Sequence, residues 1–307
     1  MDSLDEVTDR LQTLRDLVRF GTTTFNGRGL FFGHGTDNAD DEALALVAHV
    51  LDLDPHQVVR YLDARLTVNE IAAVYGLFRQ RVETRKPAAY LTHEAWFAGR
   101  PYYVDERVLV PRSPIAELIE GGFAPWLDAD DVHRVLDLCC GSGCIGLACA
   151  HELPGAEVDL ADCDPGALEV ARINVERHGL QERVRVVESD LYSRLVGQVY
   201  DLIVCNPPYV NADDYAALPP EYRHEPASGL VSGENGLQHP LAVLAGAAEH
   251  LSPRGVLVLE VGASQPALEE LLPRLDATWI EFERGGEGVA LIARSALADL
   301  AGLERAS

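Results

Sequence analysis

The sequence predicts an α/β fold: a parallel, doubly wound sheet that follows a small helical domain. From Val132 onward, short apolar runs alternate with helical stretches, and this alternation is typical of a doubly wound sheet. Two further apolar runs close the chain with turn residues between them, which predicts an antiparallel hairpin at the sheet edge. The predicted strands are residues 135–140, 158–161, 184–187, 202–205, 256–261, 279–283 and 288–293.

The first ninety residues carry helical periodicity instead. Apolar residues spaced by three and four predict one helix over residues 4–20, and Ser3 with Glu6 forms a capping box at its start. A loop over residues 21–38 leads to a second helix, and a third begins at Thr67. The sequence therefore predicts a small helical bundle.

The spacing of apolar residues changes from a helical to a strand-like pattern at the boundary between the two regions. Residues 95–104 read as a β-hairpin around Gly99, and a short helix is expected over residues 115–119. We expect a helical substrate-recognition domain over residues 1–90, a hairpin and linker over 91–114, and the main α/β domain over 115–307.

Composition narrows the functional classes. The chain has 307 residues, 47% hydrophobic content and a formal net charge of -24. An acidic surface repels phosphate backbones, so direct nucleic-acid binding is not expected, whereas a basic protein partner would suit it. There is no apolar run of about 18 residues and no basic start of a signal peptide, so we expect a cytoplasmic protein without a membrane span. The six cysteines form no paired zinc motif, so no metal site is expected.

A polar stretch, Asn206-Pro207-Pro208-Tyr209, follows the fourth predicted strand. Because ligands bind at the carboxyl ends of strands in open α/β sheets, this stretch is a candidate site. The alternative is a strand that simply ends at two prolines, which cannot donate backbone hydrogen bonds. A second candidate, His34 between two glycines, is expected to be structural, although a catalytic role is the alternative.

A glycine-rich turn follows the first predicted strand. Gly141 and Gly143 allow a sharp bend and the close approach of a ligand, but a lone Gly-x-Gly is a weak signal. Asp162, about twenty residues later, is placed to bind the hydroxyl pair of a ribose. A nicotinamide cofactor would use the same geometry, so it remains an alternative ligand. Asp164 is expected to cap the next helix. Asp190 is expected either to accept a hydrogen bond from an adenine amino group or to cap a loop.

Together these motifs resemble the class I S-adenosylmethionine-dependent methyltransferases, with a Rossmann-like, seven-stranded sheet. The Asn-Pro-Pro-Tyr stretch resembles the motif of the branch that methylates planar amide or exocyclic amine nitrogens. The resemblance implies that the side-chain carbonyl of Asn206 and the backbone carbonyl of Pro207 hold the target N–H groups, with the ring of Tyr209 beside them. The implied cofactor site, for S-adenosylmethionine, comprises Asp137, Cys139, Gly141, Ser142, Gly143, Asp162, Cys163, Asp190, Leu191 and Asn206.

Several further segments resemble the HemK/PrmC superfamily of protein glutamine methyltransferases. They are residues 109–114, 221–226, 233–237 and 285–289. Residues 33–38 and 96–107 are most similar to the PrmB-type branch, which acts on the third protein of the large ribosomal subunit. Cys140 departs from the threonine common at this position, which should alter local packing more than cofactor binding. The resemblance implies glutamine methylation of that basic ribosomal protein.

Three alternatives remain at this point. Release-factor methyltransferases share the motif and differ mainly at the N-terminus. Nucleic-acid amine methyltransferases share Asx-Pro-Pro-Tyr, but the net charge opposes them. The third is a non-catalytic assembly module with a vestigial site. The intact motif residues argue against this alternative.

Overall fold

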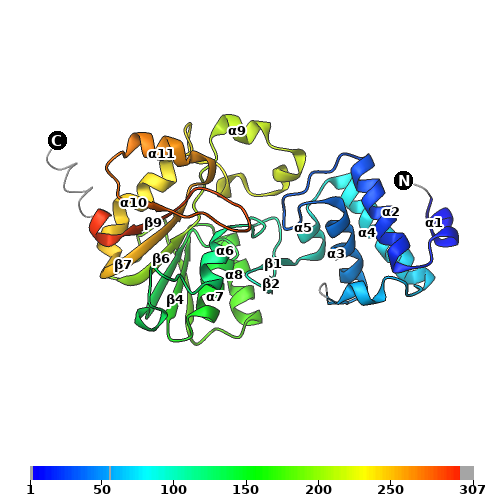
Figure 1. The fold of residues 1–307 in the computed structure, drawn as a ribbon, viewed down its shortest axis with the longest axis horizontal. Coiled ribbons are helices and arrows are strands. Elements are labelled where there is room, and N and C mark those ends of the chain that lie inside the picture. The colour runs from blue at the N-terminus through cyan, green and yellow to red at the C-terminus, as the bar shows by residue number, and fades with distance from the viewer. Residues whose placement is uncertain (1–2, 55–56, 298–307) are drawn as a thin grey trace. The chain divides into compact units, whose positions relative to one another are not determined.

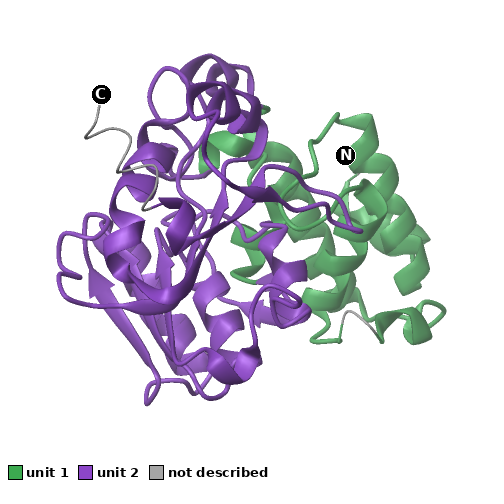
Figure 2. Cartoon of the chain, turned by 60° about the vertical axis from the view of Figure 1, so that its left-hand side comes forward, with its two compact units in different colours: residues 1–94, 219–224 green, residues 95–218, 225–307 purple. Residues whose placement is uncertain are grey.

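The computed structural model describes residues 3–54 and 57–297. The chain forms two compact units (Figures 1 and 2). Unit 1 comprises residues 1–94 and 219–224, and unit 2 comprises residues 95–218 and 225–307. Among the described helices, none has the length and apolar character that a membrane span requires.

Unit 2 is built on a seven-stranded sheet with the order β5-β4-β3-β6-β7-β9-β8. The first five strands of this order are parallel, whereas β9 pairs antiparallel with both β7 and β8. The predicted doubly wound sheet with a closing hairpin is confirmed. The strands are β3 (Arg134–Leu138), β4 (Glu157–Asp162), β5 (Val184–Glu188), β6 (Tyr200–Cys205), β7 (Leu251–Glu260), β8 (Thr278–Trp279) and β9 (Val289–Ala293).

Helices cover both faces of this sheet (Figure 1). Alternate side chains of β6 enter two separate cores, with Leu202 and Val204 in one and Ile203 and Cys205 in the other. The first core is completed by α6 (Ile115–Glu120), α7 (Cys144–Glu152) and α8 (Pro165–Arg177), and the second by α10 (Gln238–His250) and α11 (Gln265–Leu271). A short helix, α9 (Ala212–Ala217), follows the end of β6. Central strands that are buried on both faces explain the continuous apolar runs in the sequence.

The predicted β-hairpin is also present. It consists of β1 (Ala95–Phe97) and β2 (Arg100–Tyr102), which pair antiparallel. The rings of Phe97 and Tyr102 belong to the core that α6, α7 and α8 complete, so the hairpin is part of unit 2.

Unit 1 is a helical bundle, as the periodicity predicts. Its helices are α1 (Leu4–Arg10), α2 (Leu14–Gly27), α3 (Ala39–Val50), α4 (Val68–Thr84) and α5 (Ala88–Thr92). The predicted capping box of Ser3 and Glu6 is confirmed. Asn38 caps α3, and Thr67 forms a capping box with Glu70 at the start of α4.

The prediction of a single helix over residues 4–20 was wrong. The chain is extended at Leu11, and Thr13 begins a new helix by a second capping box with Asp16. The Asp16 carboxylate accepts the backbone N–H groups of Gln12 and Thr13, which a continuous helix would use internally. Since α2 then runs to Gly27, the following loop is also shorter than predicted.

A segment remote in sequence, residues 219–224, completes unit 1. Glu221 is fully buried and forms ion pairs with Arg85 at 3.0 Å and Arg81 at 3.6 Å. Its Oε1 also accepts the backbone N–H of Phe31 at 3.0 Å. Arg81 is fully buried and is bound by Glu42 at 2.8 Å. The chain that leaves the Asn-Pro-Pro-Tyr stretch is therefore anchored in the helical bundle by a buried ion cluster.

The three domain ranges expected from the sequence do not assign residues 219–224 to the helical domain. The structure places the unit boundary at Glu94, keeps the hairpin with unit 2, and assigns residues 219–224 to unit 1. The ends of the expected ranges, residues 1–2 and 298–307, lie outside the described residues.

We expect Glu221→Gln to destabilise unit 1 by about 1–3 kcal/mol, because it removes the buried charge that Arg85 and Arg81 share, while Arg81 keeps Glu42. The free energy of unfolding, measured by urea denaturation, tests this. Asp63→Asn removes the exposed partner of Arg15 and should cost less than about 1 kcal/mol. Equal losses for the two variants would contradict this account of the buried cluster.

Candidate active site

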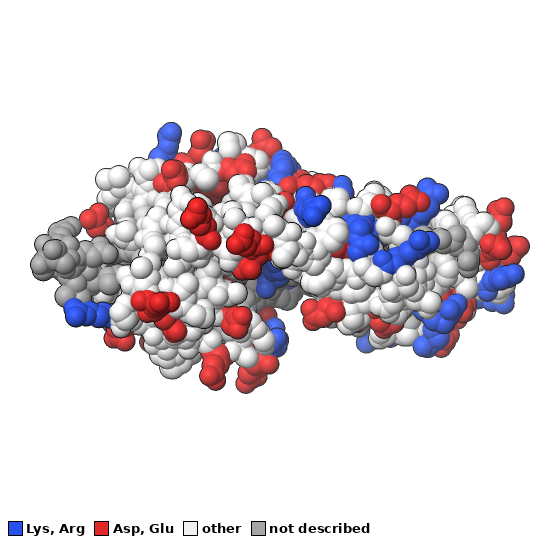
Figure 3. Space-filling model, turned by 90° about the horizontal axis from the view of Figure 1, so that it is seen from above, with Lys and Arg blue, Asp and Glu red and all other residues white. Residues whose placement is uncertain are grey.

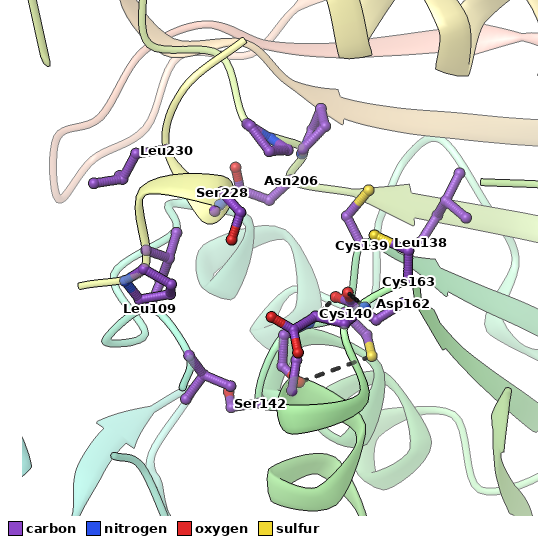
Figure 4. Close-up of a pocket in the computed structure, with 18 of the residues that line it drawn as sticks. Leu109, Leu138, Cys139, Cys140, Ser142, Asp162, Cys163, Asn206, Ser228 and Leu230 are labelled. Atoms are coloured by element: carbon purple, nitrogen blue, oxygen red, sulfur yellow. Dashed lines mark hydrogen bonds between the residues drawn. The ribbon is translucent and has the colours of Figure 1, made fainter. Parts of the chain in front are cut away.

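A cavity of about 540 Å³ opens at the carboxyl ends of the parallel strands in unit 2 (Figure 4). This volume lies within the usual range of small-molecule sites, about 300–1,000 Å³. Its walls are the segments that follow β3, β4, β5 and β6, together with the last residue of β7, Glu260. Residues 107–113, Pro226 and residues 228–230 line it as well. The predicted site edge therefore contains a cavity.

The glycine turn after β3 shapes one wall. The strand ends at Leu138, two residues earlier than predicted, because Cys139 adopts a left-handed conformation with φ 61°. Gly141 and Gly143 also have positive φ, 53° and 77°, and Gly143 is the N-cap of α7. A Cβ at Gly143 would lie 2.9 Å from Leu160 Cδ1. Glycine is therefore required here to let α7 pack closely on β4.

Two predicted cofactor residues, Asp137 and Gly143, do not line the cavity. Gly143 instead packs on β4. Asp137 is buried, and its Oδ2 accepts the backbone N–H of Gly146 at 2.7 Å, in the first turn of α7. Its Oδ1 has no hydrogen-bond partner among the described residues. Burial raises the pKa of Asp137 to about 8, so this carboxyl is neutral at pH values below about 8. Its contact is with the start of α7, after the glycine turn.

The acid at the end of β4, Asp162, lines the cavity (Figure 4). Asp162 accepts the backbone N–H groups of Gly141 and Asp164, each at 2.9 Å. The backbone N–H of Cys163 also acts on this carboxylate. A carboxylate has about four lone-pair sites, so acceptor capacity remains for a ribose hydroxyl. Asp164 caps α8, which confirms its predicted role. The other predicted cofactor residues that line the cavity are Cys139, Gly141, Ser142, Cys163, Asp190, Leu191 and Asn206.

The Asn-Pro-Pro-Tyr stretch lies at the same edge. β6 ends at Cys205, which pairs with Leu138 of β3 and Leu259 of β7. Asn206, Pro207 and Tyr209 therefore follow a central strand, and all three line the cavity. The interpretation as a simple strand stop does not account for this position.

Sequence reasoning missed one group here, the carboxylate of Glu260. It is buried, lines the cavity, and accepts hydrogen bonds from Tyr209 Oη at 2.9 Å and Ser113 Oγ at 2.5 Å. Desolvation by burial raises its pKa, although these hydrogen bonds and the charge of Arg112 act in the opposite direction. An acid at the end of an apolar strand, at the site edge, was the available signal.

His34 lies elsewhere. It is buried in unit 1, where its ring centroid is 4.4 Å from that of Tyr222, and it does not line the cavity. This position agrees with the structural role expected from the sequence.

Comparison with known proteins identifies the family. Residues 26–92 match the model of the PrmC N-terminal domain, and residues 123–218 match that of the methyltransferase small domain. A ribosomal protein uL3 glutamine methyltransferase from Neisseria gonorrhoeae is 47% identical over 95% of this chain and 98% of its own length. One from Xanthomonas campestris pv. campestris is 51% identical over 92% of this chain and 91% of its own. The chain belongs to the uL3 glutamine methyltransferase family.

Membership of this family confirms the resemblance to the HemK/PrmC superfamily, and it makes the protein an enzyme that uses S-adenosylmethionine as methyl donor. The alternatives of a nicotinamide cofactor and of a non-catalytic module are thereby set aside. Among solved structures, a methyltransferase from Pyrococcus furiosus aligns with 19% identity and a TM-score of 0.44, over 63% of this chain and 88% of its own. The fold assignment rests on the sheet order itself.

Asp137 gives a prediction about stability and pH. Its pKa is higher in the folded chain than in the unfolded chain, where it is about 3.9. Its contribution to stability is therefore complete below that value and is lost as pH rises through about 8. We expect the stability of the native sequence relative to Asp137→Asn to fall between pH 4 and pH 8, as measured by urea denaturation.

Asp16→Asn is a control of opposite sign. A hydrogen bond from the backbone N–H of Gln12 lowers the pKa of Asp16, so its contribution is lost as pH falls. If Asp137→Asn leaves the pH dependence of the free energy of unfolding unchanged, the pKa of Asp137 is not raised in the folded chain.

Proposed function

We propose that the enzyme transfers a methyl group from S-adenosylmethionine to the side-chain amide nitrogen of a glutamine in ribosomal protein uL3. The similarity to uL3 glutamine methyltransferases, 47–51% identical over more than nine tenths of the chain, carries this proposal. The cavity supports it, because Asp162 and Asn206 line one space.

The amide nitrogen of glutamine is a poor nucleophile because its lone pair is delocalised into the carbonyl group. The side-chain carbonyl of Asn206 and the backbone carbonyl of Pro207 accept its two N–H groups and stabilise the positive charge that develops on nitrogen. The Tyr209 ring offers its π face to the same charge. When bound, S-adenosylmethionine supplies the electrophilic methyl group. The nitrogen gains this methyl and loses one proton to water.

The residues around the turn suit that cofactor. Asp162 has acceptor capacity left for the ribose hydroxyls, and Asp190 is exposed at the end of β5, where it is available to the adenine amino group. Ser142, Cys163 and Leu191 complete this side of the cavity. Asp137 and Gly143 shape the turn from beneath, and we assign them an indirect part in cofactor binding.

Charge favours a basic partner. Unit 2 holds 33 of the 49 acidic side chains but only 14 of the 25 lysines and arginines, a formal charge of -19. In Figure 3, acidic side chains are prominent over this unit. Such a surface attracts a basic ribosomal protein and repels nucleic-acid phosphates. We infer that the helical bundle, unit 1, contributes to substrate recognition and that the enzyme acts in the cytoplasm.

A radiolabel assay tests the substrate. With labelled S-adenosylmethionine, we expect methyl incorporation into purified uL3 and at least tenfold less into peptide chain release factor, because the N-terminal segments resemble the ribosomal-protein branch. The label should survive nuclease treatment. Label in the release factor alone would replace the substrate assignment with the alternative, and label that nuclease removes would end both.

A pair of variants tests the division of labour in the cavity. We expect Asn206→Ala to lower kcat by about 10²–10³ with little change in cofactor affinity, because it removes a preorganised acceptor of the target amide. Asp162→Ala should instead weaken binding of S-adenosylmethionine, measured by calorimetry. The reverse pattern would show that the two roles are wrongly assigned.

A further inference from the structure

Asn174 is a polar residue of α8 that has no part in the site as described so far. Its side chain is fully buried, with 0% of its surface exposed. Asparagine is a weak helix former, and a buried amide is costly unless its hydrogen-bonding groups have partners. The partners of this side chain therefore decide what it does.

The side-chain amide of Asn174 binds backbone groups of two other segments. Its Oδ1 accepts the backbone N–H of Tyr103 at 2.7 Å. Its Nδ2 donates to the carbonyl oxygens of Tyr103 at 3.0 Å and Ser142 at 2.9 Å. Because a backbone N–H only donates and a carbonyl oxygen only accepts, these partners permit a single orientation of the amide. One side chain of α8 thus joins two segments that are remote from it in sequence.

The first of these segments is the glycine turn. Ser142 lines the cavity (Figure 4). The peptide group between Ser142 and Gly143 is held on both sides: its carbonyl accepts from Asn174, and its N–H donates to the Cys140 carbonyl at 2.8 Å. Asn174 therefore helps to fix the orientation of a peptide group within the turn that forms one wall of the cavity.

The second segment is the start of the linker that follows the β-hairpin. Both the N–H and the carbonyl of Tyr103 are bound by Asn174. The Tyr103 phenol donates to Asp105 Oδ2 at 2.9 Å, and Asp105 Oδ1 accepts the backbone N–H of Arg107 at 3.1 Å. Arg107 begins the run of residues 107–113 that lines the cavity. These contacts connect Asn174 to a second wall of the cavity.

We propose that Asn174 is a positioning residue for cofactor binding. It holds the glycine turn and the start of the linker together, so that two walls of the cavity are in place before S-adenosylmethionine binds. A preorganised site loses less conformational freedom on binding, which raises its affinity. Asn174 does not itself line the cavity and acts through Ser142 and Tyr103. The inference rests on the cofactor site of the proposed function and is independent of which protein is methylated.

Calorimetry of Asn174→Leu tests this proposal. Leucine has a similar branched shape and is a good helix former, but its side chain forms no hydrogen bonds. The carbonyl of Ser142 and both backbone groups of Tyr103 then lose a partner. We expect the Kd of S-adenosylmethionine to rise about tenfold, a loss typical of a buried polar group left without its partner.

Arg183→Met is the matched control. The Arg183 guanidinium also donates to backbone carbonyls, those of Ala150 at 2.7 Å and Ala156 at 2.8 Å. Ala150 lies in the last turn of α7, at the opposite end from the glycine turn, and Arg183 does not line the cavity. Both variants should lower the melting temperature, but Arg183→Met should leave the Kd within about twofold. An equal rise of the Kd in both variants, or no rise in Asn174→Leu, would overturn the positioning role.

Kinetics separate positioning from a simple loss of folded enzyme. If Asn174 positions the cavity walls, the KM for S-adenosylmethionine rises in Asn174→Leu, and saturating cofactor brings kcat to within about twofold of the native value. A lower kcat at unchanged KM would show only a smaller folded fraction and would contradict the proposal. The methyl acceptor in this assay is whichever of uL3 and release factor the native enzyme labels.

Hydrogen exchange in the native enzyme is a second test that needs neither a variant nor a protein substrate. Coupling is reciprocal, so bound S-adenosylmethionine must stabilise the hydrogen bond from the Tyr103 N–H to Asn174 by the same factor. We expect the Tyr103 amide to exchange about tenfold more slowly at saturating cofactor, as measured by NMR. The Leu66 amide, which donates to the Gln12 carbonyl in unit 1, is the internal control and should not change.

The outcomes distinguish this inference from the proposed function. Unchanged exchange at Tyr103 in the presence of bound cofactor would overturn the role of Asn174, even if Asn174→Leu fails to fold. Failure of the native enzyme to bind S-adenosylmethionine would instead overturn the cofactor site. Failure to label uL3 would overturn the substrate assignment alone.

Discussion

The parallel pairing of β4, β3, β6 and β7 is the constraint on which the site depends. Parallel strands end at one edge, so the glycine turn, Asp162, Asn206 and Glu260 meet there although they are spread over more than one hundred residues. Burial of both sheet faces holds the register, because a slip of one residue would move side chains such as Ile203 and Val204 into the wrong cores.

Two buried carboxyl groups in this unit illustrate how environment separates the roles of one functional group. Asp137 accepts one backbone N–H, and its pKa is raised to about 8, so it serves the turn as a largely neutral group. Burial also raises the pKa of Glu260, but hydrogen bonds from Ser113 and Tyr209 and the charge of Arg112 act in the opposite direction. The first bonds to the helix that follows the glycine turn, and the second holds the phenol of Tyr209.

The helical bundle and the catalytic stretch share one covalent segment. Residues 219–224, thirteen residues after Asn206, belong to the core of unit 1 through Glu221, Arg81 and Arg85. The chain between Tyr209 and Pro219 thus has one end at the cavity and the other in the bundle. The helical bundle of unit 1 and the cavity of unit 2 are therefore joined by one continuous stretch of chain.

The sequence by itself determined the strand and helix pattern, the capping boxes at Ser3 and Thr67, and the positions of the glycine turn, Asp162 and Asn206, because periodicity and turn chemistry are local properties. Tertiary structure alone decided which of these residues open to the cavity. Neither Asp137 nor Gly143 lines it, because Gly143 packs against Leu160 of β4 and the Asp137 carboxyl accepts the backbone N–H of Gly146 in α7. Glu260 and Glu221 acquired their partners through contacts 51 and 190 residues away in sequence, which no local pattern contains.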